Sequence, residues 1–396
     1  MSERTPAAFE MPASVGRARQ RAIVAAGLGV AAMIAGLVAD QAQFYRSYLV
    51  AFIFWSGLGL GCLGLLMVQH LSGGAWGLVI RRLLEAGAKC LLVMAVLFVP
   101  LLFGLPHVYE WAQPELVATD AILQHKQPFL NVPFWIGRTA FYFVIWVGMA
   151  FLLSRWSSEQ DAAPGRPYDA RFGRLSGPGL VVFGLTVSLA AVDWMMSVDP
   201  HWFSTIYGFV MIGGAGLSAF CFVVIWLARL AESAPMAAYV RPSHFHDLGK
   251  FILAFVMLYA YFTFSQFLII WSANLPEEIP WYLRRLSGGW QYVMLGLTLL
   301  HFALPFALLL SSDLKKNARL LSRLAMLVLA MRIVDIVFQV APQFHEGVTF
   351  HWLDLAAVVG VGGLWVAAFA WFLRGRPILP VNDPYFKEAF ATHGSH

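Results

Sequence analysis

Long apolar runs separated by short polar connectors cover almost the whole chain. Each run holds about 20 predominantly apolar residues, the length that an α-helix needs to cross the hydrocarbon core of a bilayer. The pattern predicts ten membrane-spanning helices, at residues 21–39, 48–69, 90–110, 134–153, 177–196, 203–228, 248–271, 289–311, 318–340 and 352–373. We therefore expect an all-α polytopic membrane protein. It would have an N-terminal arm at residues 1–20, a ten-helix domain at 21–374 and a C-terminal tail at 375–396.

Composition agrees with this pattern, since 59% of the 396 residues are hydrophobic and only 12% are charged. The charged share is about half that of an ordinary soluble domain. The longest expected connectors, residues 111–133, 154–176 and 229–249, are too short for a soluble catalytic domain. Any chemistry must therefore take place in or at the bilayer.

Basic residues are distributed unevenly between the two sides of the predicted bundle. Most of them fall in the N-terminal arm, in every second connector and in the tail, whereas the other five connectors hold only Arg46, Lys126, Arg284 and Arg285. By the positive-inside rule both termini are expected in the cytoplasm. This bias also explains the net charge of +5 without a nucleic-acid partner.

Cysteine and histidine usage argues against a metal or haem centre in this chain. Cys62, Cys90 and Cys221 form no C-x-x-C or C-x-x-C-H motif, so covalent haem, an iron–sulfur cluster and a structural zinc site are not expected. Only His107 and His301 fall within spans, at different depths, which is not the arrangement that ligates a b-type haem. The cytoplasmic H-F-H-D at residues 244–247 falls short of a closed zinc site, and helix capping explains it better.

Glycines gather in the second span, as SGLGLGCLG, and in the sixth, as GGAG. Small residues let membrane helices approach closely. A phosphate-binding loop would need a strand before the glycines, so we expect helix packing here.

Span nine carries the clearest group of polar residues. Arg332, Asp335 and Gln339 are spaced i, i+3 and i+7 and therefore share one face of the helix. A charged side chain at the bilayer centre costs at least about 3 kcal/mol, so such residues need a partner or a function. Two interpretations of Arg332 and Asp335 remain open with about equal support. They form an ion pair that is only structural, or they form part of a functional site.

Other polar residues are expected in the outer half of the membrane, leaving the inner half nearly bare of them. They are His107, Glu110, Arg138, Asp193, Gln266 and Asp354. Glu110 and Asp354 are also explained by an interfacial position. His301, in the middle of span eight, is an exception, and it could donate to a carbonyl freed by Pro305. Together the outer set predicts a site that holds a polar head group and passes protons outward.

Three stretches carry a family resemblance: AVDWMMSVDPHWFSTIYG, HDLGKFILAFVMLYAYFTFSQFLIIWSANLPEE and LPVNDPYFKEAF. They resemble the membrane subunits of bacterial alternative complex III, in the NrfD-like (polysulfide-reductase) family, and are closest to the smaller of two paralogous subunits. The resemblance implies two four-helix bundles plus two extra helices, in the bacterial inner membrane. It also implies a role in a quinol:cytochrome c (electron acceptor) oxidoreductase.

The same resemblance implies the partners and the cofactors. The expected partners are a paralogous NrfD-like membrane subunit, an iron–sulfur protein and multihaem cytochrome c subunits, with lipid around them and a terminal oxidase as a further candidate. A quinone or menaquinone is the only cofactor implied, with no haem or iron–sulfur cluster in this chain. In the family, the larger paralogue is the stronger candidate for the quinol site.

We therefore assign hypothetical roles to seven residues. Asp193 and Asp335 would accept protons, with Arg332 holding Asp335 ionised. The candidates for hydrogen bonds to a quinone or along a proton path are His107, Gln266, Gln339 and His301. The alternatives are a scaffold whose polar groups only join helices, and a secondary transporter, which would need matching broken helices in the two halves.

Overall fold

The computed structural model describes residues 12–162, 168–386 and 390. Over these residues the chain is helical and contains no strand. The prediction of ten helices long and apolar enough to span a membrane is confirmed for this part of the chain. Parts of the predicted arm and tail, residues 1–11, 387–389 and 391–396, lie outside the described residues.

Most spans are single helices, but the third and the eighth are divided. The single ones are α1 (Ala13–Ala39), α2 (Gln41–Ser72), α9 (Val132–Ala162), α10 (Tyr168–Trp194), α11 (Tyr207–Leu230), α13 (Pro242–Ala273), α18 (Ala318–Val340) and α19 (Trp352–Phe372). Span three consists of α3 (Ala75–Lys89), α4 (Leu91–Leu97) and α5 (Val99–Leu102). Span eight consists of α15 (Trp290–Leu297), a π-helical turn (Thr298–Ala303) and α16 (Leu304–Leu310).

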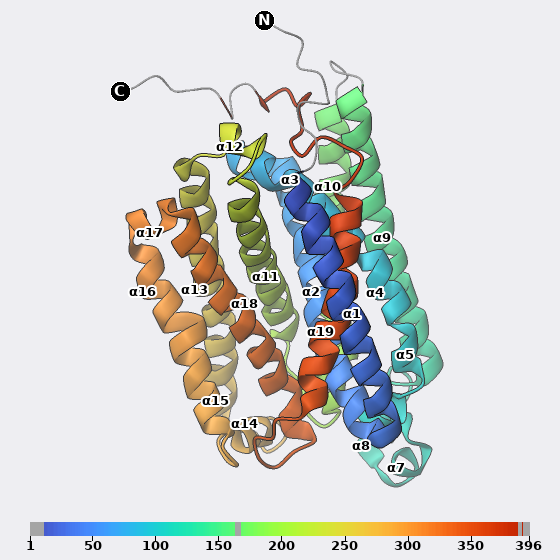
Figure 1. Cartoon of the computed structure of the whole chain (residues 1–396). Helices are drawn as coiled ribbons and strands as arrows, with labels where there is room; N and C mark the ends of the chain where they lie inside the picture. The colour runs from blue at the N-terminus through green and yellow to red at the C-terminus, as the bar shows by residue number, and fades with distance from the viewer. Residues whose placement is uncertain (1–11, 163–167, 387–389, 391–396) are drawn as a thin grey trace, which may run out of the picture.

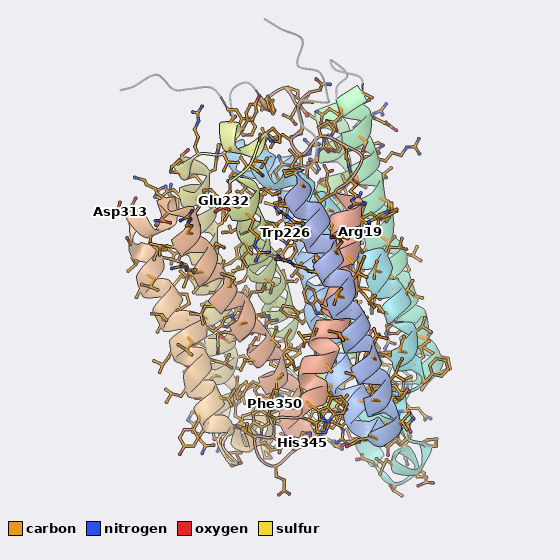
Figure 2. The ribbon with its side chains drawn as sticks, in the orientation of Figure 1. Arg19, Trp226, Glu232, Asp313, His345 and Phe350 are labelled. Atoms are coloured by element: carbon orange, nitrogen blue, oxygen red, sulfur yellow. The ribbon has the colours of Figure 1, made fainter. Side chains whose placement is uncertain are left out.

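Short helices cover the two ends of the bundle. They are α6 (Leu105–Val108), α7 (Pro114–Thr119), α8 (Ala121–Lys126), α12 (Met236–Tyr239), α14 (Pro280–Arg285) and α17 (Ser312–Lys316). We call the end where α1 begins and α19 ends the termini end, and the end that carries α7, α8 and α14 the opposite end (Figure 1). In Figure 2, Glu232 and Asp313 lie toward the termini end, and His345 and Phe350 lie at the opposite end.

Two long helices, α2 and α11, form the centre and are buried along most of their length. One group of spans surrounds α2, where α3 and α10 pack on α2 and α9 packs on α10, α3 and α4. A second group surrounds α11, where α13 and α18 pack on α11, and α15 and α16 close the group against α18 and α13. The remaining pair, α1 and α19, pack along each other and against α2 (Figure 1).

The third span starts earlier than the apolar pattern predicted. It begins at Ala75 rather than at residue 90, and its helix ends at Leu102. Arg81, Arg82 and Glu85 lower the hydropathy of its first turns, yet all three side chains are buried. The expectation that buried polar groups avoid the termini end is therefore wrong.

Close helix packing at the glycine clusters is confirmed. A Cβ added at Gly61 on α2 would lie 2.0 Å from the backbone carbonyl oxygen of Ala215 on α11. Because that oxygen belongs to helical backbone, it cannot move aside without separating the two central helices. Glycine at position 61 therefore sets the distance between α2 and α11.

We predict that Gly61→Ala destabilises the protein by about 1–3 kcal/mol, the usual cost of overpacking a well-packed core. The matched control is Gly57→Ala on the same helix, where an added Cβ meets nothing within 4 Å. Thermal unfolding of the detergent-solubilised variants would measure the difference. Equal midpoints for the two variants would contradict the proposed contact.

Candidate functional site

Four of the seven candidate residues meet at one place between α13, α18 and the π-helical turn. Tyr259 of α13 lies at the centre, with Arg332, Asp335 and Gln339 of α18 and His301 of the π-helical turn around it. We call these five residues the Asp335 cluster. All five side chains are buried, and the predicted shared face of the α18 residues is confirmed.

Hydrogen bonds within the cluster converge on one carboxylate oxygen. The Tyr259 hydroxyl and Arg332 Nη1 both donate to Asp335 Oδ2 over short distances, and Gln339 Nε2 donates to the same atom at 3.1 Å. Arg332 Nη1 and Gln339 Nε2 also donate to the Tyr259 hydroxyl, at 2.7 and 3.2 Å. No hydrogen bond from the described residues reaches Asp335 Oδ1, so this carboxylate keeps an oxygen that can accept a proton.

Two further polar atoms of the cluster have no partner in the described part of the chain. His301 Nε2 and Gln339 Oε1 are both buried without a hydrogen bond. The imidazole ring of His301 lies edge-on to the Tyr259 ring, with centroids 5.3 Å apart. Unpaired buried polar atoms are costly, and single π-helical turns occur frequently at functional sites. The two observations together mark this cluster as the strongest candidate site.

A glycine makes room for the guanidinium of Arg332. A Cβ added at Gly214 on α11 would lie 2.4 Å from Arg332 Cζ. Because Asp335 and Tyr259 hold the guanidinium, it is not free to move away. The GGAG stretch of the sixth span therefore positions the cluster in addition to packing helices.

Arg285 of α14 supports the same cluster from the opposite end, and the sequence pattern gave no sign of this role. Its guanidinium donates to the backbone carbonyls of Phe338 and Gln339 at 3.1 and 2.6 Å, and so satisfies the last turn of α18. It also lies 3.4 Å above the Trp281 ring. Burial lowers the pKa of Arg285 to about 9. Arg285 has no acidic partner among the described residues, and backbone carbonyls accept its hydrogen bonds instead. The bonds to the last turn of α18 hold Gln339 beside Asp335.

Asp193 lies apart from the Asp335 cluster, in the first group of helices. Arg138 of α9 donates to both its carboxylate oxygens, at 2.6 and 3.0 Å, and the Tyr142 hydroxyl donates at 2.8 Å. The side chain is fully buried, with 0% exposure. A two-pronged arginine pair with both oxygens occupied is typical of a structural tie between helices. This geometry favours the scaffold interpretation for Asp193, while its role as a proton acceptor stays a prediction.

The other two candidates also lie outside the cluster. The ring of His107 in α6 stacks on Tyr45, with centroids 5.5 Å apart, and its side chain is partly exposed. Gln266 accepts a hydrogen bond from the Ser204 hydroxyl at 2.8 Å and lies 3.4 Å from the hydroxyl of Tyr282. Gln266 therefore connects α13 to Ser204, in the segment before α11, and to Tyr282 of α14.

The termini end holds a buried ion-pair network that the sequence analysis missed. Glu85 accepts from Arg82 and from Arg376 of the tail, both at 2.9 Å, while Arg81 donates to Asp383 at 2.7 Å. The signal for it was present, since Glu85 follows Arg82 and Arg81 by three and four residues in R-R-x-x-E. Its other partners, however, lie on α9 and in the tail, far away in the sequence.

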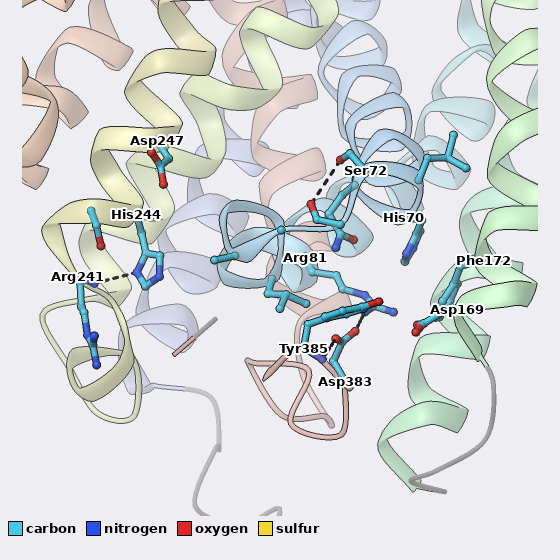
Figure 3. Close-up of a pocket in the computed structure, with 17 residues that line it drawn as sticks. His70, Ser72, Arg81, Asp169, Phe172, Arg241, His244, Asp247, Asp383 and Tyr385 are labelled. Carbon is cyan, nitrogen blue, oxygen red and sulfur yellow. Dashed lines mark hydrogen bonds and ion pairs between the residues drawn. The ribbon is translucent and has the colours of Figure 1, made fainter. Parts of the chain in front are cut away.

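A cavity with a volume of about 600 Å³ lies at the termini end, beside this network. Figure 3 shows the residues that line it. Residues from the ends of α2, α3, α10 and α13 and from the tail line it, including His70, Arg81 and Asp383. None of the seven candidate residues lines it. Nor do the described residues contain a group of three or more His, Cys, Asp or Glu side chains placed to hold a metal ion.

Comparison with known proteins assigns no family. No protein-family model matches the chain, and no curated protein matches it at a significant level.

We predict that Asp193→Asn destabilises the protein by about 3 kcal/mol, because removing one partner of a buried pair leaves the Arg138 charge uncompensated. The control is Asp120→Asn at the same end, where the carboxylate is partly exposed and pairs with His201 at 2.7 Å. Unfolding of both variants in mixed detergent micelles would measure the difference. A structural role for Asp193 is ruled out if Asp193→Asn and Asp120→Asn have the same unfolding midpoint.

Proposed function

We propose that this chain is a membrane subunit of a bacterial quinol:cytochrome c oxidoreductase of the alternative complex III type, in the NrfD-like family. It would correspond to the smaller paralogous membrane subunit, ActF, in the inner membrane with the termini end in the cytoplasm. The observation that carries the proposal is the Asp335 cluster, where one oxygen of a buried carboxylate and two nearby polar atoms have no hydrogen-bond partner among the described residues. Its task would be to conduct protons outward.

Quinol oxidation needs such a group. Oxidation of a quinol to a quinone releases two electrons, which would pass to the iron–sulfur protein and the cytochrome subunits, and two protons, which need acceptors. Asp335 would take a proton at Oδ1, while Arg332 favours the ionised form between transfers. Tyr259 and Gln339 would keep the carboxylate in place through Oδ2.

The resemblance favours proton conduction over head-group binding within this chain, because the larger paralogue is the stronger candidate for the quinol site in the family. We therefore expect quinol to be oxidised in the paralogous partner, and the Asp335 cluster would conduct the protons released there.

A purely structural subunit of the same complex is the second candidate. The Asp193–Arg138 pair and the ion-pair network at the termini end support it, because paired charges join α9 to α10 in the first case and α3 to the tail in the second. A transporter is less well supported. The interrupted helices are the third and the eighth spans, which do not occupy corresponding places in the two groups of four.

We predict that Asp335→Asn slows quinol-dependent reduction of cytochrome by the assembled complex by about 100-fold, a typical contribution of a positioned proton-transfer group. Tyr259→Phe should slow it in the same direction, because the carboxylate loses a hydrogen bond that positions it. Tyr259→Phe is the cleaner variant, because it removes one hydroxyl and leaves the Arg332 charge paired. The matched control is Tyr142→Phe, which removes the hydroxyl that donates to Asp193 in the other group of helices.

Turnover would be measured on complexes shown to contain all subunits. Normal turnover in both Tyr259→Phe and Asp335→Asn complexes would reject the proton path and leave the scaffold function. An equal loss in the Tyr142→Phe control would show that disturbing any buried carboxylate slows the complex.

A further inference from the structure

A second cavity at the termini end is rich in basic side chains. It has a volume of about 530 Å³ and lies between the last turns of α9, the junction of α3 and α4, and the chain that follows α19. Four cationic residues, two serines and one aspartate supply its polar lining: Lys89, Arg155, Arg374, Arg376, Ser154, Ser158 and Asp161. We call it the basic cavity.

Protein carboxylates account for only part of this positive charge. Asp161 forms a short pair with Arg82, and Arg376 pairs with Glu85 at 2.9 Å. Arg155 pairs with Glu159 at 3.0 Å on the surface. The structure shows no ion pair for Lys89 or Arg374 with any residue that it describes. Two positive charges at the cavity therefore lack a counter-ion from this part of the chain.

Lys89 is the more telling of the two, because its side chain is only 8% exposed. An ammonium group has three N–H donors. Among the described residues, Lys89 Nζ makes one hydrogen bond, to the Phe372 carbonyl at 3.4 Å, and it lies 4.8 Å from the centre of the Phe372 ring. Capping the end of α19 uses one donor, and the other two have no partner in this part of the chain and are available to a ligand in the cavity.

Exposed apolar side chains lead away from the cavity along two helices. On α4 and α5, Leu92, Val96 and Val99 follow Lys89 at i+3, i+7 and i+10, on the face that Lys89 shares, and all three are exposed. On α9, exposed Phe151 lies one turn from Arg155 toward the middle of the helix. A molecule with an anionic head and apolar chains would match both features.

We propose that the basic cavity binds the phosphate head group of an anionic phospholipid, with the acyl chains lying along α4 and α9. Basic pockets between membrane helices are a known means of holding such head groups. Lys89 and Arg374 would pair with the phosphate oxygens, and the hydroxyl of Ser154, which only accepts a hydrogen bond from Arg376 among the described residues, would donate to them. The site is independent of the proton path, because none of its residues belongs to the Asp335 cluster.

The test is native mass spectrometry of the full chain, purified from membranes in a mild detergent. We expect bound phosphatidylglycerol to be retained in preference to phosphatidylcholine, and not to be displaced by millimolar inorganic phosphate. Arg374→Gln, at an exposed position, should weaken phosphatidylglycerol binding about five-fold, the effect of one basic residue near an anionic lipid. Lys89→Gln should weaken it at least as much.

The control is Arg319→Gln, which removes an exposed basic residue of α18 at the same end. Arg319 lies 3.8 Å from Glu232, its one ion-pair partner in the described part of the chain. Its lipid retention should equal that of the unmodified protein. Equal retention by the Arg374→Gln and Arg319→Gln proteins would overturn the proposal, as would equal retention of the two lipids. Displacement by inorganic phosphate would show a site for a soluble anion and would also overturn it.

Discussion

An ionised side chain inside a membrane needs an opposite charge, and in this protein a neighbouring helix or the tail often supplies it. Arg138 of α9 meets Asp193 of α10, and Arg376 of the tail meets Glu85 of α3. Without its partner, each charge would lose several kcal/mol of interaction in a medium of low dielectric constant. The positions of α3, α9, α10 and the tail therefore depend on these pairs as much as on apolar packing.

Each of the two groups of helices contains a buried aspartate that is bonded to an arginine and a tyrosine. The two carboxylates differ in how many of their oxygens accept hydrogen bonds. In the first group both oxygens of Asp193 are occupied by bonds from α9. In the second group the bonds of Asp335 gather on Oδ2, and Arg332 comes from the same helix, three residues away. The ion pair lies within α18, and α13 is joined to it through the uncharged Tyr259 hydroxyl, so scaffolding explains the burial of the two charges less well than at Asp193. This asymmetry is the physical reason for proposing Asp335, rather than Asp193, as the proton-transfer group.

The spacing of polar residues predicted which side chains share one face of a helix. It did not predict which residues of neighbouring helices they contact. Spacing alone placed Arg332, Asp335 and Gln339 on one face, and run length gave the ten spans. The pairing of Asp193 with Arg138 was not predicted, although both residues were noted, because the sequence does not say which faces of α9 and α10 meet. The start of span three was predicted too late for a related reason. Arg81, Arg82 and Glu85 are expected at the surface by their charge, and the sequence does not show that ion-pair partners elsewhere in the chain allow their burial.

The tail completes the charge network at the termini end, and it also carries a basic residue that this network does not neutralise. Asp383 neutralises Arg81, and Arg376 neutralises Glu85, so these two tail residues together add no net charge to the interior. Arg374, a few residues earlier, has no such partner among the described residues and lines the basic cavity with Lys89. The charges of Lys89 and Arg374 therefore remain without a protein counter-ion in the described part of the chain. An anionic lipid bound at the basic cavity would compensate them.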